Sequence, residues 1–144
     1  MKHLAPFFAA LALLAVAAVG AQTPRPTPTV PHMVYVAEIV RVVDGDTVDV
    51  DIALGFNIHT QIRIRVAHID APEMRGPERP DGIRATEYAR TFLGQHAILV
   101  PPDSRGFRRG RYGRWIADLE VNGHLLSREM LSSGNAERYP PVRP

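Results

Sequence analysis

Four acidic side chains lie where the chain is expected to turn or to end a strand. Asp44 and Asp46 belong to a tight-turn pattern, Asp-Gly-Asp, and Asp70 and Glu73 flank a proline that ends a later strand. Carboxylates that come close in space repel each other unless a cation joins them. Oxygen-only ligation suits calcium or magnesium, and the small number of carboxylates favours calcium, whose looser geometry accepts carbonyls and water.

A general base and two phosphate-binding groups would complete such a site. Glu73 follows Asp70 by three residues across a proline-fixed turn, where its carboxylate would take a proton from an attacking water. Arg65 and Arg114 would bind the phosphoryl oxygens, whose negative charge increases in the transition state. Taken singly, each residue has a simpler interpretation as a turn former, a strand-end residue or an exposed charge.

The arginines are unevenly distributed along the chain. All but one of the 17 basic residues are arginine, although the formal net charge is only +2. A dense run comprises Arg105, Arg108, Arg109, Arg111 and Arg114. A genomic preference for arginine explains the residue type but not the clustering, and the guanidinium group suits phosphate. The pattern favours a polyanionic partner.

Missing residue types exclude other kinds of chemistry. The chain has no cysteine, which excludes thiol catalysis and thiolate metal sites. Its six histidines include no H-x-x-x-H pair, which argues against a zinc site.

The first 32 residues are expected to lie outside the folded domain. Residues 1–21 combine a basic start, an apolar run and a small-residue site after Ala21, which is typical of a cleaved export signal. Uncleaved, the run would be a membrane anchor, although it is slightly shorter than the roughly 20 residues of a spanning helix. Residues 22–32 contain four prolines and predict an extended spacer. The protein is therefore expected to be secreted or periplasmic.

Residues 33–139 are expected to form one domain, followed by a tail at 140–144. Apolar and alternating patterns predict strands at 34–43, 47–54, 60–69, 97–100 and 115–121. A helical stripe predicts a helix at 81–93 with Asp81 as its cap, and a last short helix ends at Gly134. A helix between the third and fourth of five strands, with a short C-terminal helix, predicts a mainly β fold built on a five-stranded OB-type barrel.

One spacing does not fit a straight strand. Arg65 and Asp70 are five residues apart, so on a regular strand their side chains would point to opposite faces. Both reach one pocket only if the chain bends or bulges between Val66 and Ile69. We therefore expect an irregularity in that segment.

Three motifs together resemble those of the staphylococcal nuclease (thermonuclease) family. They are V-V-D-G-D-T at 42–47, R-V-A-H-I-D-A-P-E at 65–73 and R-Y-G-R at 111–114. Their order and spacing match as well, and the resemblance runs from about Tyr35 to Gly134. It implies an OB-fold, calcium-dependent nuclease that hydrolyses DNA, RNA or both to 3′-phosphate products. No stable protein partner is implied, and a monomer is expected.

By motif position, the resemblance also implies a metal site. Asp46, Asp70 and the backbone carbonyl of Ala71 would bind one calcium ion, and Asp44 would support the site without contacting the ion. Ala71 stands where the best-known member of the family has threonine, but only the backbone oxygen is used.

The resemblance assigns the remaining residues to catalysis and substrate binding. Glu73 would be the general base or orient the water, and Arg65 and Arg114 would hold the phosphate. Tyr112 and Arg111 would bind the substrate, with Arg111 preserving the charge of a lysine.

Some positions depart from the family pattern. Gly110 replaces an aspartate that helps shape the site, and Tyr139 is the nearby candidate for stacking on the base. The chain also stops about where the family's last helix would begin.

Two other functions remain open. A catalytically silent, nuclease-like module would hold nucleic acid on an arginine-rich barrel, although every residue assigned to ligation, base or phosphate contact is present. A cell-envelope interaction domain, projected from an uncleaved anchor, would show no calcium effect.

Overall fold

The computed structural model describes residues 34–140 of the 144-residue chain. The predicted export signal at 1–21, the proline-rich spacer at 22–32 and residues 141–144 lie outside this range. Within it, no helix has the length and apolar character needed to span a bilayer.

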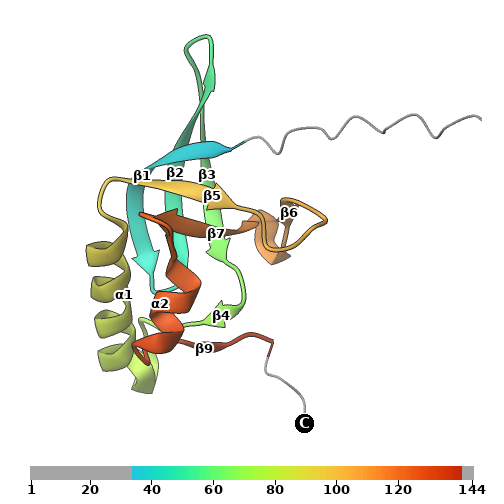
Figure 1. Ribbon diagram of the computed structural model, residues 1–144. Helices are drawn as coiled ribbons and strands as arrows, with labels where there is room; N and C mark the ends of the chain where they lie inside the picture. Colours follow the sequence, from blue (N-terminus) through green and yellow to red (C-terminus); the bar gives the residue numbers. More distant parts are fainter. Residues whose placement is uncertain (1–33, 141–144) are drawn as a thin grey trace, which may run out of the picture. The chain divides into compact units, whose positions relative to one another are not determined.

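Five strands form a closed barrel (Figure 1). They are β1 (Tyr35–Asp44), β2 (Thr47–Gly55), β3 (Ile58–Val66), β5 (His96–Val100) and β7 (Trp115–Val121). Antiparallel pairs run in the order β3-β2-β1-β5-β7, and a parallel pairing of β3 with β7 closes the sheet. The predicted five-stranded OB-type barrel is confirmed.

Strand β2 shows why these segments form a barrel. Val48, Val50 and Ile52 are buried and alternate with the more exposed Asp49 and Asp51. Removing one such apolar side chain from water contributes about 1.5–3 kcal/mol. The alternation therefore places one face of the strand in the core and leaves the other for polar groups.

Two helices cover the barrel, as predicted. Helix α1 (Arg79–Leu93) buries Ala85 and Ala89, and helix α2 (Leu126–Ser132) buries Met130 in the same core. The barrel interior and the two helices thus share one apolar cluster.

The predicted cap of the first helix is wrong. Helix α1 begins at Arg79, and Glu78 occupies the cap position at the end of the 3-10 turn η1 (Gly76–Glu78). Asp81 lies in the first turn instead, where a negative charge favours the helix N-terminus. Pro80 in the same turn explains the earlier start, because proline suits the first helical positions.

The third strand ends earlier than predicted, at the expected irregularity. Strand β3 stops at Val66, and a turn at Ala67 and His68 follows, with His68 in the left-handed region at φ 68°. The chain then resumes as β4 (Ile69–Asp70). The predicted bend between Val66 and Ile69 is confirmed.

Several short elements have no counterpart in the predicted order. They are β6 (Arg108–Arg109), the 3-10 turn η2 (Arg111–Gly113), β8 (His124–Leu125) and β9 (Glu137–Arg138). Strand β6 pairs with β7, and β9 pairs with β4. Segments this short carry no periodic pattern, so partners elsewhere in the fold define them.

Candidate active site

The turn between β1 and β2 is packed too closely to accept a side chain at its centre. A Cβ atom on Gly45 would lie 2.7 Å from the Cβ of Ala71 and 3.0 Å from that of Ala85. Within the turn, Asp44 Oδ1 accepts the backbone N–H of Asp46 at 3.0 Å. The glycine therefore lets the Asp46 segment lie directly against the Ala71 segment and helix α1.

Asp46 is a buried carboxylate with several donors. Its Oδ2 accepts the backbone N–H of Ala71 at 2.8 Å, and its Oδ1 accepts the Thr47 hydroxyl at 3.1 Å. Burial raises the pKa of Asp46 to about 6, against the opposing effects of the Ala71 hydrogen bond and the Arg65 charge. A nearby cation would therefore stabilise its charged form.

Arg65 joins the two aspartates that the sequence placed at strand ends. Its Nη1 lies 2.8 Å from Asp46 Oδ2, and its Nη2 lies 2.6 Å from Asp70 Oδ1. Nη1 also donates to the carbonyl of Ile69 at 2.9 Å, which the bend after β3 brings within reach. The Arg65 side chain is 17% exposed, whereas that of Asp70 is 61% exposed. The structure thus brings Asp46, Asp70 and Arg65 together.

The donor set at this point fits a hard divalent cation. Two carboxylates already converge on one positive group, and the Ala71 backbone lies beside them. No group of three or more His, Cys, Asp or Glu side chains suited to a metal occurs among residues 34–140. Carbonyl and water oxygens would therefore complete the coordination, which calcium tolerates better than magnesium.

The segment that carries Glu73 lies directly on helix α1. A Cβ atom on Gly82 would lie 2.4 Å from the carbonyl oxygen of Glu73 and 2.9 Å from that of Pro72. The backbone N–H of Glu73 donates to the Glu78 carboxylate at 3.1 Å. Glu73 itself is exposed, and in the part of the chain described here no hydrogen bond or ion pair joins its side chain to the aspartates. Water can therefore reach its carboxylate.

Arg111, Tyr112 and Arg114 lie together around the η2 turn. Tyr112 adopts a left-handed conformation at φ 60°, and its side chain is exposed, with the residue 89% accessible. The guanidinium carbon of Arg114 lies 5.7 Å from the centre of the Tyr112 ring, within reach of a cation–π contact. Gly110 donates its N–H to the carbonyl of Arg114 at 2.8 Å, so the turn closes without a side chain at that position.

The closing pair of barrel strands determines where Arg114 stands. Ile64 pairs with Trp115 in the parallel β3–β7 ladder, so Arg114 is next to Arg63 in the register. Arg63 and Arg65 alternate onto the same face of β3. Arg114 is therefore level with Arg63 and displaced along β3 from Arg65, and among the described residues no ion pair joins it to Asp46 or Asp70.

Sequence reasoning missed the strand that supports Asp70. Asp70 pairs with Glu137 across β4 and β9, and the N–H of Tyr139 donates to the carbonyl of His68 at 2.8 Å. The ring of Tyr139 lies 6.0 Å from the Arg65 guanidinium carbon. The candidate stacking tyrosine is therefore at the site, brought there by a two-residue strand that leaves no pattern in the sequence.

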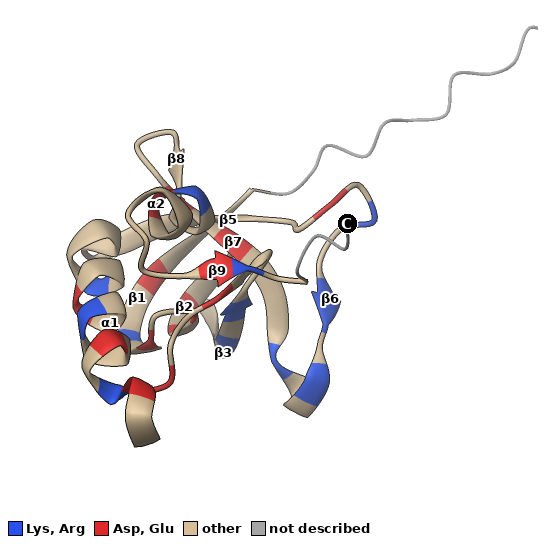
Figure 2. Ribbon diagram, turned by 90° about the horizontal axis from the view of Figure 1, so that it is seen from below, with Lys and Arg blue, Asp and Glu red and all other residues tan. Residues whose placement is uncertain are grey.

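The basic run is partly neutralised. Asp103 forms ion pairs with Arg105 and Arg108, both at 2.8 Å. Figure 2 shows basic positions on β6 and in the segment that follows it, and others on β3 and on α1. The spacing of Asp103 from its two arginines was visible in the sequence and indicates that part of the cluster is internally paired.

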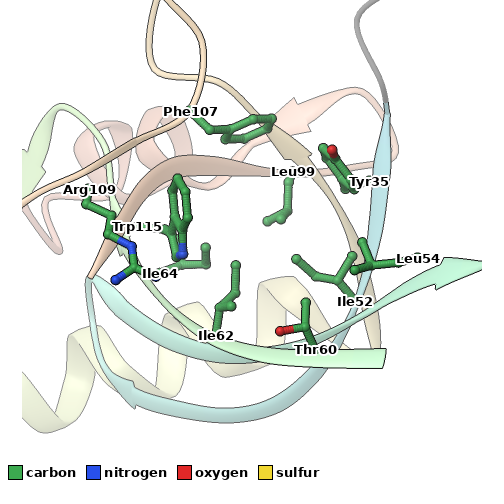
Figure 3. Close-up of a pocket in the computed structure, with 10 residues that line it drawn as sticks. All are labelled: Tyr35, Ile52, Leu54, Thr60, Ile62, Ile64, Leu99, Phe107, Arg109 and Trp115. Atoms are coloured by element: carbon green, nitrogen blue, oxygen red, sulfur yellow. The ribbon is translucent and has the colours of Figure 1, made fainter. Parts of the chain in front are cut away.

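An apolar hollow lies inside one end of the barrel, apart from the aspartates. It has a volume of about 290 Å³ and is lined mainly by apolar groups such as Ile62, Leu99 and Phe107 (Figure 3). Arg109 stands at its edge, 5.0 Å from the Trp115 ring centre. No carboxylate lines this hollow, so it is not a metal site.

Comparison with known proteins identifies one matching family. The profile of the staphylococcal nuclease homologue family matches residues 63–144. Protein ParB of Escherichia coli is 34% identical over 91 residues, covering 63% of this chain and 45% of the relative. An uncharacterized endonuclease of Escherichia coli O157:H7 is 29% identical over 102 residues, covering 70% of this chain and 59% of the relative. A thermonuclease of Staphylococcus hyicus is 26% identical over 109 residues, covering 72% of this chain and 60% of the relative. The chain spans less than two thirds of the length of each of these relatives.

Proposed function

Because the chain belongs to the staphylococcal nuclease homologue family, we propose that this nuclease-like domain is a calcium-dependent phosphodiesterase acting on DNA, RNA or both. The observation that carries the proposal is the convergence of Asp46 and Asp70 on the Arg65 guanidinium. A buried carboxylate, an exposed one and an arginine at one point are what a divalent cation and a phosphodiester together require.

One calcium ion is the proposed cofactor. Asp46, Asp70 and the carbonyl of Ala71 would hold it, and Asp44 supports Asp46 through the hydrogen bond to its backbone. The bound ion would supply positive charge that stabilises the phosphoryl oxygens in the transition state.

The protein's own side chains would carry the proton and the charge. Glu73 accepts a proton from the water that attacks phosphorus, a role typically worth about 10²–10⁴ in rate. Arg65 and Arg114 donate hydrogen bonds to the phosphoryl oxygens. These hydrogen bonds become stronger as negative charge builds up on the oxygens in the transition state. The bond from phosphorus to the 5′ oxygen breaks and that oxygen takes up a proton, so the phosphate stays on the 3′ side.

Arg111 and Tyr112 are proposed substrate contacts. Both lie on the exposed η2 turn next to Arg114, where a polynucleotide would pass. Tyr139 is proposed as a further aromatic contact because of its place beside Arg65.

A nuclease assay tests the proposal. Plasmid and single-stranded DNA are incubated with the protein in calcium or in chelator, next to Glu73→Gln and Arg114→Ala. We expect calcium-dependent degradation that falls by about 10²-fold or more in both variants. Arg90→Ala is the control, because Arg90 pairs with Glu87 on the outer face of α1. Retardation of the DNA without degradation would instead favour a silent nucleic-acid-binding module.

We also propose that residues 1–21 direct export and are removed, leaving a secreted or periplasmic protein that begins at Gln22. The mass of the protein recovered from producing cells tests this. A mature chain that retains Met1 in the membrane fraction would instead support the anchored alternative.

A further inference from the structure

A polar hollow of about 440 Å³ adjoins the candidate active site. Val40, Asp49 and Arg63 contribute to it from β1, β2 and β3, and Tyr112 and Arg114 close it from the η2 turn. We propose that this hollow binds the nucleoside unit next to the scissile phosphate. The inference rests on the proposed nuclease function and adds to it a defined second contact with the substrate strand.

The position of the hollow fits one step along a polynucleotide. Arg63 and Arg65 are on one face of β3 and two residues apart, a separation of about 7 Å along the strand. Arg114 belongs both to the hollow and to the proposed phosphate-binding groups. A strand held by its phosphate between Arg65 and Arg114 would therefore place its neighbouring sugar and base over Arg63.

The Arg63 charge in the hollow is partly neutralised within the protein. Arg63 donates to both oxygens of Asp49, at 2.6 and 2.8 Å, and Arg41 donates to the same carboxylate at 3.1 Å. The Arg63 guanidinium lowers the pKa of Asp49, so the carboxylate stays charged. A charged carboxylate accepts hydrogen bonds from ring N–H, amino and hydroxyl groups such as a nucleoside carries.

The remaining walls suit a sugar and a base. The Tyr112 ring is exposed, and Arg114 beside it leaves the other side of the ring to the hollow or to solvent. Val40 is 52% exposed and supplies an apolar contact, and the Gln61 amide offers both a donor and an acceptor. Arg114 Nε is buried and has no hydrogen-bond partner among the described residues. An aromatic surface with a few polar groups is what binding a flat, polar-edged ring needs.

The test blocks the hollow with a bulky side chain and measures whether a second nucleoside on the substrate still increases kcat/KM. The substrates are dithymidylate, which has a nucleoside on both sides of the phosphate, and the two methyl phosphodiesters of thymidine. Each methyl diester has a nucleoside on only one side of the phosphate. For Val40→Trp, kcat/KM for dithymidylate should fall about tenfold relative to one of the two methyl esters, the one whose nucleoside lies outside the hollow, which is the loss of one stacking contact. Val36→Trp is the matched control, because Val36 is on the same strand, 57% exposed and outside the hollow.

A second pair of variants removes a contact without adding bulk. Gln61→Ala should lower the same ratio, and His59→Ala, two residues earlier on the same face of β3 and outside the hollow, should not. Ratios that stay unchanged against both methyl esters, in folded Val40→Trp and in Gln61→Ala, would overturn the proposal. If the wild-type protein with calcium cleaves neither these diesters nor single-stranded DNA, the nuclease function fails by itself. Fluorescence anisotropy of labelled oligothymidylate then still tests whether the hollow binds a nucleoside. Equal binding to wild type and Val40→Trp would overturn that proposal.

Discussion

At the level of single residues, Arg65 contacts the same two carboxylates that a metal ion would bind. Its guanidinium forms ion pairs with Asp46 and Asp70, and the same group is proposed to bind the substrate phosphate. A divalent cation at the two carboxylates would take over the first task and leave Arg65 for the second. Metal binding and phosphate binding are therefore expected to be coupled through this one side chain.

Replacing Arg65 should separate the two tasks. In Arg65→Ala the aspartates lose their positive neighbour, so we expect calcium affinity to rise about tenfold while cleavage falls by about 10²-fold or more. Isothermal titration with calcium measures the first and single-stranded DNA cleavage the second. Arg63→Ala is the affinity control, because Arg63 pairs with Asp49 instead. Weaker calcium binding by Arg65→Ala would contradict this assignment.

At the scale of elements, two close backbone approaches position the site. Gly45 allows the β1–β2 turn to reach Ala71, and Gly82 allows the Glu73 segment to lie on helix α1. The bend after β3 then turns Asp70 toward Arg65. These three features carry the aspartates and the glutamate to one end of the barrel.

Adding a methyl group at Gly82 should move Glu73. Alanine favours a helix over glycine by about 0.8–1 kcal/mol, so Gly82→Ala should stay folded, but its Cβ would overlap the Glu73 carbonyl. We expect kcat to fall by about 10²-fold, as a displacement of about 1 Å can cause, and the melting temperature to fall because overpacking against the Glu73 backbone costs about 1–3 kcal/mol. Glu87→Ala, on the exposed face of α1, is the control. Full activity in Gly82→Ala would show that this contact does not position the base.

Sequence reasoning reached the periodic elements and the motif residues but not the contacts between distant short segments. The alternation of β2 and β3 and the odd spacing of Arg65 and Asp70 correctly predicted strands and a bend. The pairing of β4 with β9 was not predictable, because two-residue strands have no period and depend on the packed fold. Gly82 likewise looks like an ordinary helical glycine until the segment opposite it is known.

At the scale of the whole molecule, a buried carboxylate away from the site ties a strand to a helix. Asp118 on β7 accepts hydrogen bonds from the backbone N–H of Leu119 at 2.8 Å and of Ser127 at 3.2 Å, and from the Ser127 hydroxyl. Helix α2, which carries Met130 under Gly45, is thereby anchored to the barrel. Stability and site geometry thus share one element.

The titration of Asp118 should be visible in the stability of the protein. Burial raises its pKa above the ordinary 3.8, against the effects of Ser127, Leu119 and the charge of His68. The folded state therefore binds this proton more tightly than the unfolded state, so this group's contribution to the free energy of unfolding falls as pH rises above 3.8 and levels off above the folded-state pKa. Asp118→Asn removes that fall. Urea unfolding at about pH 4 and about pH 7 measures the change in the free energy of unfolding between the two pH values. An equal change in wild type and Asp118→Asn would contradict the prediction.

The calcium dependence of cleavage is the decisive measurement for the proposed metal site at Asp46 and Asp70. Single-stranded DNA is incubated with wild type and with Asp70→Asn over a calcium titration, and fragments and their end groups are followed. We expect saturable, calcium-dependent cleavage to 3′-phosphate ends by the wild type, and a loss of about 10²-fold or more in Asp70→Asn. Cleavage that persists in chelator, or that Asp70→Asn performs as well as wild type at every calcium concentration, would contradict it.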